Sequence, residues 1–134
     1  MTAQKTADIA KDFFDAIEAG DIDKVYNLFS IDAKIWHNSD DATVPREVTA
    51  KTLKVMHKLL RNIEYQERRV DSWPTGFVER HLLTGVRKID GVKVRMPVCI
   101  VCDINGEGKI TRLDEYFDSA AQNIFVQSPT KSKI

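Results

Sequence analysis

The amino-acid sequence predicts an α+β fold in which most helices precede most strands. Up to residue 60, apolar residues recur mainly at the three- and four-residue spacing of helices. Between residues 63 and 118, apolar and polar residues alternate, as in strands with one buried face. Turn sequences rich in glycine divide this second part. The predicted order is helix, helix, strand, helix and then a meander of strands.

The helical part contains three predicted helices with recognisable ends. The first covers residues 6–19 and ends at Gly20, because glycine readily takes the left-handed conformation that closes a helix. Asp21 can cap a second, shorter helix that reaches Phe29, and Pro45 can open a third. The apolar side chains that define the three helices are Ile9, Phe13 and Ile17, then Ile22, Val25 and Leu28, then Val48, Leu53, Met56, Leu59 and Leu60.

One predicted strand, Asp32–Asn38, lies among the helices, and a polar loop, Ser39–Thr43, follows it. Pro97 has no backbone N–H, so we expect a sheet edge or a bulge there. The later strands are predicted at residues 63–73, 77–88, 92–104 and 109–118. A hairpin turn is predicted at Asp90-Gly91, and a glycine-rich turn at residues 105–108 precedes the last strand. A final helical turn is predicted at residues 119–125.

The size and charge of the chain are those of one ordinary globular domain. We expect residues 1–125 to form that domain and 126–134 a polar tail. Lys plus Arg and Asp plus Glu number 20 each, which gives no electrostatic basis for binding nucleic acid or an anionic membrane. No apolar run has membrane-spanning length, and the start lacks the apolar core of a signal peptide, so we expect a cytoplasmic protein.

Neither the cysteines nor the histidines form a metal-binding pattern. Cys99 and Cys102 lie in an apolar run, where their odd spacing puts them on opposite faces of a strand. We expect two buried, reduced thiols that pack as small apolar groups. The three histidines show no ligand spacing, so no metal and no cofactor are predicted.

Glu115 is the first candidate functional residue. In the last strand it shares a face with Leu113 and Phe117, where an ionised carboxylate is costly unless it has a partner. Arg80 poses the same problem two strands earlier, because it shares a face with Val78 and Leu82 and cannot lose its charge. We therefore expect Arg80 and Glu115 to form a pair, either as a catalytic group or as a buried structural ion pair.

His37 is the second candidate. If Lys34 faces water, strand alternation points His37 to the opposite side, together with Ala33 and Ile35. A neutral imidazole can accept and return a proton near pH 7, which suits isomerisation, elimination or cyclisation. The alternative is a core histidine bonded to a backbone carbonyl. The neighbours Trp36 and Asn38 enter the same pocket if the strand bulges; without a bulge Trp36 packs beneath the third helix.

Short motifs in their order along the chain resemble the nuclear transport factor 2-like superfamily, in particular its SnoaL-like, polyketide-cyclase-like branch. They are Ala19-Gly20-Asp21, the strand entry Phe29-x-x-Asp32-Ala33 and the closing Tyr116-Phe117-Asp118. The resemblance covers residues 5–120 and implies a cystatin-like cone, in which a curved antiparallel sheet wraps around three N-terminal helices and encloses one deep pocket. It also implies a homodimer formed through the outer face of the sheet. The apolar residues expected on that outer face are Val92, Val94, Val101 and Tyr116.

The resemblance also implies roles for single residues. In ketosteroid isomerase the base lies five residues after the aspartate that opens the first strand, and the same count from Asp32 reaches His37. Arg80 and Glu115 match an arginine and the final-strand aspartate of limonene epoxide hydrolase, but Leu82 replaces its other aspartate. Phe13 stands where the isomerase has its tyrosine, and the protonated carboxylic acid of the isomerase has no match near Cys99 or Ile100. The residues expected to bind the substrate are Phe13, Ile35, Trp36, Asn38, Leu82, Leu113 and Phe117.

Two functions follow. The first is a cofactor-free isomerase, dehydratase, cyclase or epoxide-hydrolase-like enzyme that acts on a small apolar or amphipathic molecule, with His37, Arg80 and Glu115 as its catalytic residues. The second is a protein built on the same cone that binds a small ligand or forms a dimeric interaction module without catalysis.

Overall fold

The computed structural model describes residues 1–126, which contain four helices and six strands. In chain order these are α1 (Ala3–Ala19), α2 (Ile22–Leu28), β1 (Phe29–His37), β2 (Ala42–Val44), α3 (Arg46–Leu59), β3 (Leu60–Trp73), β4 (Gly76–Arg87), β5 (Lys93–Ile104), β6 (Ile110–Phe117) and α4 (Ser119–Val126). The α+β fold and the three N-terminal helices are as predicted. The predicted tail lies, apart from Val126, outside the described residues.

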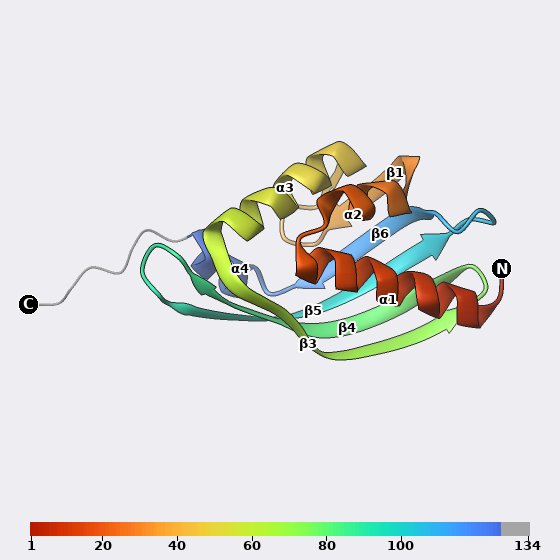
Figure 1. Cartoon of the computed structure of the whole chain (residues 1–134). Coiled ribbons are helices and arrows are strands. Elements are labelled where there is room, and N and C mark those ends of the chain that lie inside the picture. The colour runs from red at the N-terminus through yellow and green to blue at the C-terminus, as the bar shows by residue number, and fades with distance from the viewer. Residues whose placement is uncertain (127–134) are drawn as a thin grey trace, which may run out of the picture.

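The six strands form one curved sheet in the order β2-β1-β6-β5-β4-β3. Helices α1, α2 and α3 lie on its concave face, and α4 lies near one end of the sheet, close to α3 (Figure 1). A wholly antiparallel sheet was predicted, but the sheet is mixed, because β1 runs parallel to β6. A parallel pair needs a long crossover. Here the segment from β2 to β5 lies between the two strands along the chain.

The helix ends follow the predicted capping chemistry. Gly20 has a φ of 77° and its N–H bonds to carbonyls of the last turn of α1, and the Asp21 side chain accepts from Lys24 N at the start of α2. Pro45 is the N-cap of α3. The hairpin turn is also confirmed, since Gly91 has a φ of 73° and Arg87 N donates to Val92 O over 2.8 Å.

The core lies between α1 and the sheet. Phe14 packs edge-on against Phe13 and Phe77 with ring centroids 5.1 and 6.0 Å apart, and Phe13 packs against Phe29 at 5.3 Å. All four rings are at most 1% exposed. Burial of each such side chain contributes roughly 1.5–3 kcal/mol. These contacts fix the sheet against α1, so the inward-facing residues of the sheet keep defined positions.

Some predicted details of the strands were wrong. β1 begins at Phe29, before Asp32, and the loop predicted to extend to Thr43 contains the start of the short strand β2. Val94 faces the core, because it is only 3% exposed. Pro97 lies in β5, an interior strand, but one residue beyond the last pairing of β5 with β6, Val98↔Phe117. On that side no strand among the described residues pairs with β5 at Pro97, so Pro97 lies at a local sheet edge although β5 is an interior strand.

The two cysteines lie on opposite faces of β5, as their spacing predicts. Cys102 is fully buried on the inner face, whereas Cys99 is only partly buried on the outer face. The expectation of two buried thiols therefore holds for Cys102 alone. Within residues 1–126, no helix is long and apolar enough to span a membrane.

Candidate functional site

The candidate site forms where β1 and β6 lie side by side. Their parallel register places His37 directly next to Glu115, and both side chains point to the concave face. His37 Nε2 lies 3.4 Å from Glu115 Oε1, and the side chains are 25% and 23% exposed. The two predicted candidates, identified separately in the sequence, thus lie together at the C-terminal ends of two parallel strands. The side chain of Glu115 is therefore next to the imidazole of His37.

A small apolar hollow lies in front of this pair, under α1 and α3. Its volume is about 60 Å³. It is lined by Phe13, Ile17, Ile35, His37, Thr49, Thr52, Leu53, Tyr65, Ile100, Leu113 and Glu115. Three of the residues predicted to bind a substrate, Phe13, Ile35 and Leu113, are therefore in contact with this space.

A second hollow of about 170 Å³ continues toward α4. It shares Thr52, Leu53, Tyr65 and Glu115 with the first, and its other walls are largely apolar side chains of α3, β3 and α4, among them Met56. The interior space is thus two adjoining hollows instead of one deep pocket. Glu115 lies at their junction, where it can reach a molecule in either one.

Burial favours the neutral forms of both His37 and Glu115. It raises the pKa of Glu115 to about 7, and the negative charge of Glu79 adds to this rise. It lowers the pKa of His37 below the usual value of 6.5, against a smaller opposing effect of Asp40. Near pH 7 the imidazole is therefore mainly neutral and can accept a proton, while about half of the Glu115 carboxyl groups carry a proton that they can donate.

Three polar residues next to the site were not recognised in the sequence. Glu79 and His81 point inward from β4, with His81 Nδ1 2.6 Å from Glu79 Oε1 and side chains that are 1% or less exposed. Tyr65 stacks on the His81 ring at 4.0 Å and lines both hollows. Phe77 and Leu83 share the inner face of β4 with Glu79 and His81, but Val78 and Leu82 lie on its outer face, so alternation along β4 did not single out these two polar residues.

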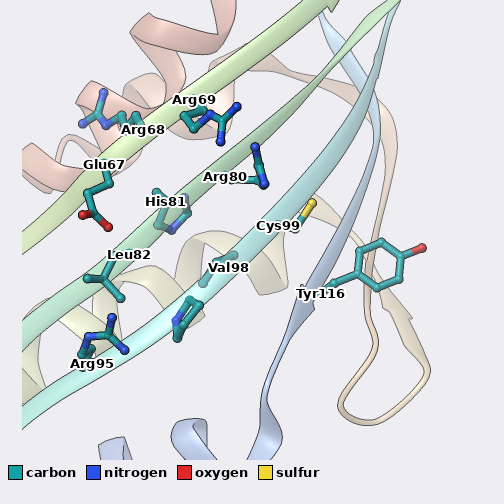
Figure 2. Close-up of a pocket in the computed structure, with 11 residues that line it drawn as sticks. Glu67, Arg68, Arg69, Arg80, His81, Leu82, Arg95, Val98, Cys99 and Tyr116 are labelled. Atoms are coloured by element: carbon teal, nitrogen blue, oxygen red, sulfur yellow. The ribbon is translucent and has the colours of Figure 1, made fainter.

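Arg80 does not pair with Glu115, which corrects the sequence prediction. It is exposed on the outer face of the sheet, beside Arg69 and Cys99 and in a shallow hollow of about 690 Å³ (Figure 2). Leu82 lines the same outer hollow and so cannot contact a molecule in front of His37. Both faces of β4 carry apolar residues, and Phe77, fully buried, determines which face is inside.

Trp36 and Asn38 also point elsewhere than predicted. Trp36 lies on the outer face, where it packs against Tyr116 at 5.2 Å and donates to Asp41 Oδ1 over 2.7 Å. The Asn38 side chain bonds to both backbone polar groups of Phe117, each over 3.0 Å, and so continues the β1–β6 pairing. Phe117 is buried and its ring lies 6.3 Å from that of His37. Phe117 therefore supports the imidazole from the side.

Comparison with known proteins gives a fold. No family model matches the sequence, and no curated protein matches it. A candidate polyketide cyclase from Xanthomonas campestris pv. campestris superposes with a TM-score of 0.81 at 18% identity, covering 93% of this chain and 98% of that one. An NTF2-like protein from Burkholderia xenovorans LB400 gives 0.77 at 20% identity, covering 95% and 99%.

A third similar structure is a hypothetical protein with a ketosteroid isomerase-like fold from Catenulispora acidiphila, in complex with trimethylamine. It gives a TM-score of 0.76 at 15% identity, and the match covers 92% of this chain and 99% of that one. At these identities the likeness concerns the fold alone. The chain has the nuclear transport factor 2-like fold, and the resemblance seen in the sequence is confirmed at that level.

Proposed function

We propose that the protein is a cofactor-independent acid–base enzyme of the SnoaL-like type that acts on a small, mostly apolar carbonyl compound. One observation carries this proposal: a neutral imidazole and a carboxyl group with a pKa of about 7 lie 3.4 Å apart at the edge of an apolar hollow. General acid–base catalysis works best with groups that titrate near the operating pH. Perturbed groups in a cleft are typical of active sites.

The proposed reaction is proton transfer next to the carbonyl group. His37 takes a proton from the carbon, the electron pair of the broken C–H bond forms a C=C bond, and the carbonyl oxygen gains the proton of Glu115. If the ketone has a neighbouring C=C bond, return of the proton from His37 to the far carbon of the resulting dienol gives isomerisation. Protonation of a β-hydroxyl group by His37 and its loss as water, with the enol proton going back to Glu115, gives dehydration. Attack of the enol on a second carbonyl, whose oxygen takes the proton from His37 while the enol proton goes back to Glu115, gives cyclisation. Each of these outcomes needs only the two groups already present.

The oxygen that gains negative charge requires hydrogen-bond donors, which are usually the largest contribution to such catalysis. The tyrosine of ketosteroid isomerase is replaced by Phe13, but Tyr65 lines the same hollow from β3. Burial, and then the charges of Glu115 and Glu79, raise the pKa of Tyr65, so its hydroxyl keeps its proton. Epoxide hydrolysis is disfavoured, because Arg80 lies outside the cone.

The shapes of the two hollows suggest an amphipathic substrate. Its reacting part would occupy the small hollow beside His37, and an apolar extension would lie between α3 and α4 against Met56 and Phe125. Glu115 at the junction would then contact the substrate at the boundary between its polar and apolar parts.

Exchange of α-protons for deuterium in simple ketones tests the proposal. We expect the protein to accelerate exchange of 2-heptanone in D₂O near neutral pH, and His37→Ala to reduce that acceleration by about two to four orders of magnitude. His57→Ala is the matched control, since His57 lies on α3 with its Nε2 2.7 Å from Ile17 O, outside the hollows. Acceleration that persists in His37→Ala contradicts the proposal. If the acceleration of exchange is lost in Glu115→Gln but not in His37→Ala, Glu115 on β6 is the base instead of His37.

A second candidate function is binding of a small organic cation without catalysis. The favouring observation is a carboxylate in a hollow lined by the aromatic rings of Phe13 and Tyr65, the type of site that attracts alkylammonium ions. The Catenulispora protein of similar fold was solved with trimethylamine. In this case trimethylammonium should shift the NMR signals of Tyr65 and His37 in the wild type and leave those of Glu115→Gln unchanged.

We also propose a cytoplasmic homodimer that forms through the outer face of the sheet. Two free cysteines support a reducing compartment. Tyr116, which is 45% exposed and packs on Trp36, and the outer hollow support association. Light scattering at micromolar concentration should give twice the chain mass of 15.3 kDa, and Tyr116→Asp should reduce it. The chain mass alone in the wild type contradicts the dimer.

A further inference from the structure

A second His–Glu pair lies behind the proposed site. Glu79 and His81 are two residues apart on β4 and point to the concave face, with His81 Nδ1 2.6 Å from Glu79 Oε1. Neither side chain is more than 1% exposed, and the second carboxylate oxygen of Glu79, Oε2, has no hydrogen-bond partner among the described residues. A buried carboxylate with an unsatisfied oxygen is costly, so a compensating role is expected.

The pairing of the strands relates this pair to Glu115. Glu79 is opposite Ile100 on β5, and Ile100 is opposite Glu115 on β6, so the two carboxyl groups belong to one row of inward-facing residues. The two strand spacings amount to about 10 Å. Only the apolar side chain of Ile100 stands between them in this row. Little solvent therefore screens the charge of Glu79 at the position of Glu115.

The groups that face Glu115 from the surrounding elements are few. They are His37 on β1, Tyr65 on β3, Glu79 on β4, the hydroxyl groups of Thr49 and Thr52 on α3 and the amide of Gln122 on α4, while α1 contributes apolar side chains. Phe14 of α1 packs beside His81 at 5.7 Å, and Tyr65 covers the other part of its ring. Among the described residues, Glu79 is thus the acidic side chain that acts on Glu115 from inside the sheet.

We propose that Glu79, held in place by His81, is a positioning residue that opposes ionisation of Glu115 and so prepares it to act as a general acid. The inference rests on the proposed function of Glu115. The negative charge of Glu79 disfavours a second negative charge in the same interior. Glu79 itself has no contact with either hollow, since it lines neither of them.

The net charge of the Glu79–His81 pair sets the size of this effect. With a neutral imidazole the pair carries one negative charge, and this charge opposes ionisation of Glu115. With a protonated imidazole the pair has no net charge, and the opposition largely disappears.

Carboxyl-carbon NMR of Glu115 tests this inference without requiring turnover. Two point charges about 10 Å apart shift each other's pKa by roughly one pH unit at an effective dielectric constant of 20. We therefore expect Glu79→Gln, which keeps the shape and the bond to His81, to lower the titration midpoint of Glu115 by roughly one pH unit. Glu67→Gln, the same change at an exposed residue on β3, is the control and should leave the midpoint unchanged.

His81→Gln separates an electrostatic role from a purely structural one. It keeps the charge of Glu79 and offers an amide donor, so the Glu115 midpoint should stay at least as high as in the wild type. If the pair only excludes water, both variants admit solvent and both lower the midpoint. A lower midpoint in His81→Gln, or an unchanged one in folded Glu79→Gln, overturns the inference. Because the readout is a titration, this failure is distinct from a failure of the ketone-exchange assay, which would overturn the proposed enzyme instead.

Discussion

The molecule contains two His–Glu pairs on the same face of the same sheet, and they differ in packing. His37 and Glu115 come from two neighbouring parallel strands, lie 3.4 Å apart and are about a quarter exposed to a hollow. His81 and Glu79 come from one strand, lie 2.6 Å apart and are completely enclosed. The residue types are identical, so the difference lies in what surrounds them.

Enclosure restricts what the second pair can do. Tyr65 and Phe14 cover His81, so no ligand can reach its ring. The first pair faces a space that a small molecule can enter, so both groups can contact a substrate from the side of the hollow. A buried pair of this kind fixes charge and structure, whereas a partly open pair can exchange protons with a substrate.

The largest expected effect is on stability, and it should separate the two pairs. His81→Ala leaves Glu79 buried without its partner and removes the stacking on Tyr65, which should cost about 3–5 kcal/mol of unfolding free energy. His37→Ala makes the same chemical change at a partly exposed residue and should cost about 1 kcal/mol or less. Urea unfolding of both variants at one pH measures the two values. Equal losses would show that enclosure does not distinguish the pairs.

The second effect concerns the dependence of stability on pH. The pKa of Glu115 is about 7 in the folded protein and 4.5 in the unfolded chain, so between these values the folded state holds a proton that the unfolded state has lost. This contribution to stability is complete below pH 4.5 and is lost as the pH rises through 7, by up to about 3 kcal/mol. His37 acts in the opposite direction below pH 6.5, because its pKa is lowered.

Glu115→Gln isolates the contribution of Glu115, since glutamine does not titrate. The difference in unfolding free energy between variant and wild type should grow in favour of the variant from pH 4.5 to 7. A difference that stays constant across this range would mean that Glu115 titrates normally, and it would then resemble an ordinary surface carboxylate.

The sequence predicted the half of the sheet that carries the open pair. In β1 and β6 the outer face is mostly polar apart from Trp36 and Tyr116, so alternation correctly placed His37 and Glu115 on the inside. The helix ends were predictable for a similar reason, because Gly20 and Asp21 act through local backbone geometry. That the two residues meet could not be read from the sequence. It depends on the parallel pairing of strands far apart along the chain.

The half with the enclosed pair was mispredicted for a physical reason. β4 has apolar residues on both faces, because its outer face lines the shallow outer hollow. The run Val78 to Leu82 therefore did not show which face of β4 is buried. In β3, Asn62 and Glu67 have positive φ angles, and the pairing register shifts beside both. Such bulges reverse the alternation locally, which made Tyr65 unrecognisable as an inward residue.

The smallest expected effect is at Arg80, the immediate neighbour of Glu79 on the opposite face of β4. If Arg80 formed with Glu115 the buried ion pair that was one of the two sequence interpretations, Arg80→Met would be strongly destabilising. Because Arg80 is exposed and no carboxylate among the described residues forms a salt bridge with it, we expect a change within about 0.5 kcal/mol. Urea unfolding of Arg80→Met and of Glu79→Met at one low protein concentration measures the change in unfolding free energy for both variants. If the outer face forms a dimer, Arg80→Met would alter association and its effect would depend on concentration. A loss of several kcal/mol that is independent of concentration would show that Arg80 has a buried partner after all, and burial would then not explain why two adjacent charges on one strand differ.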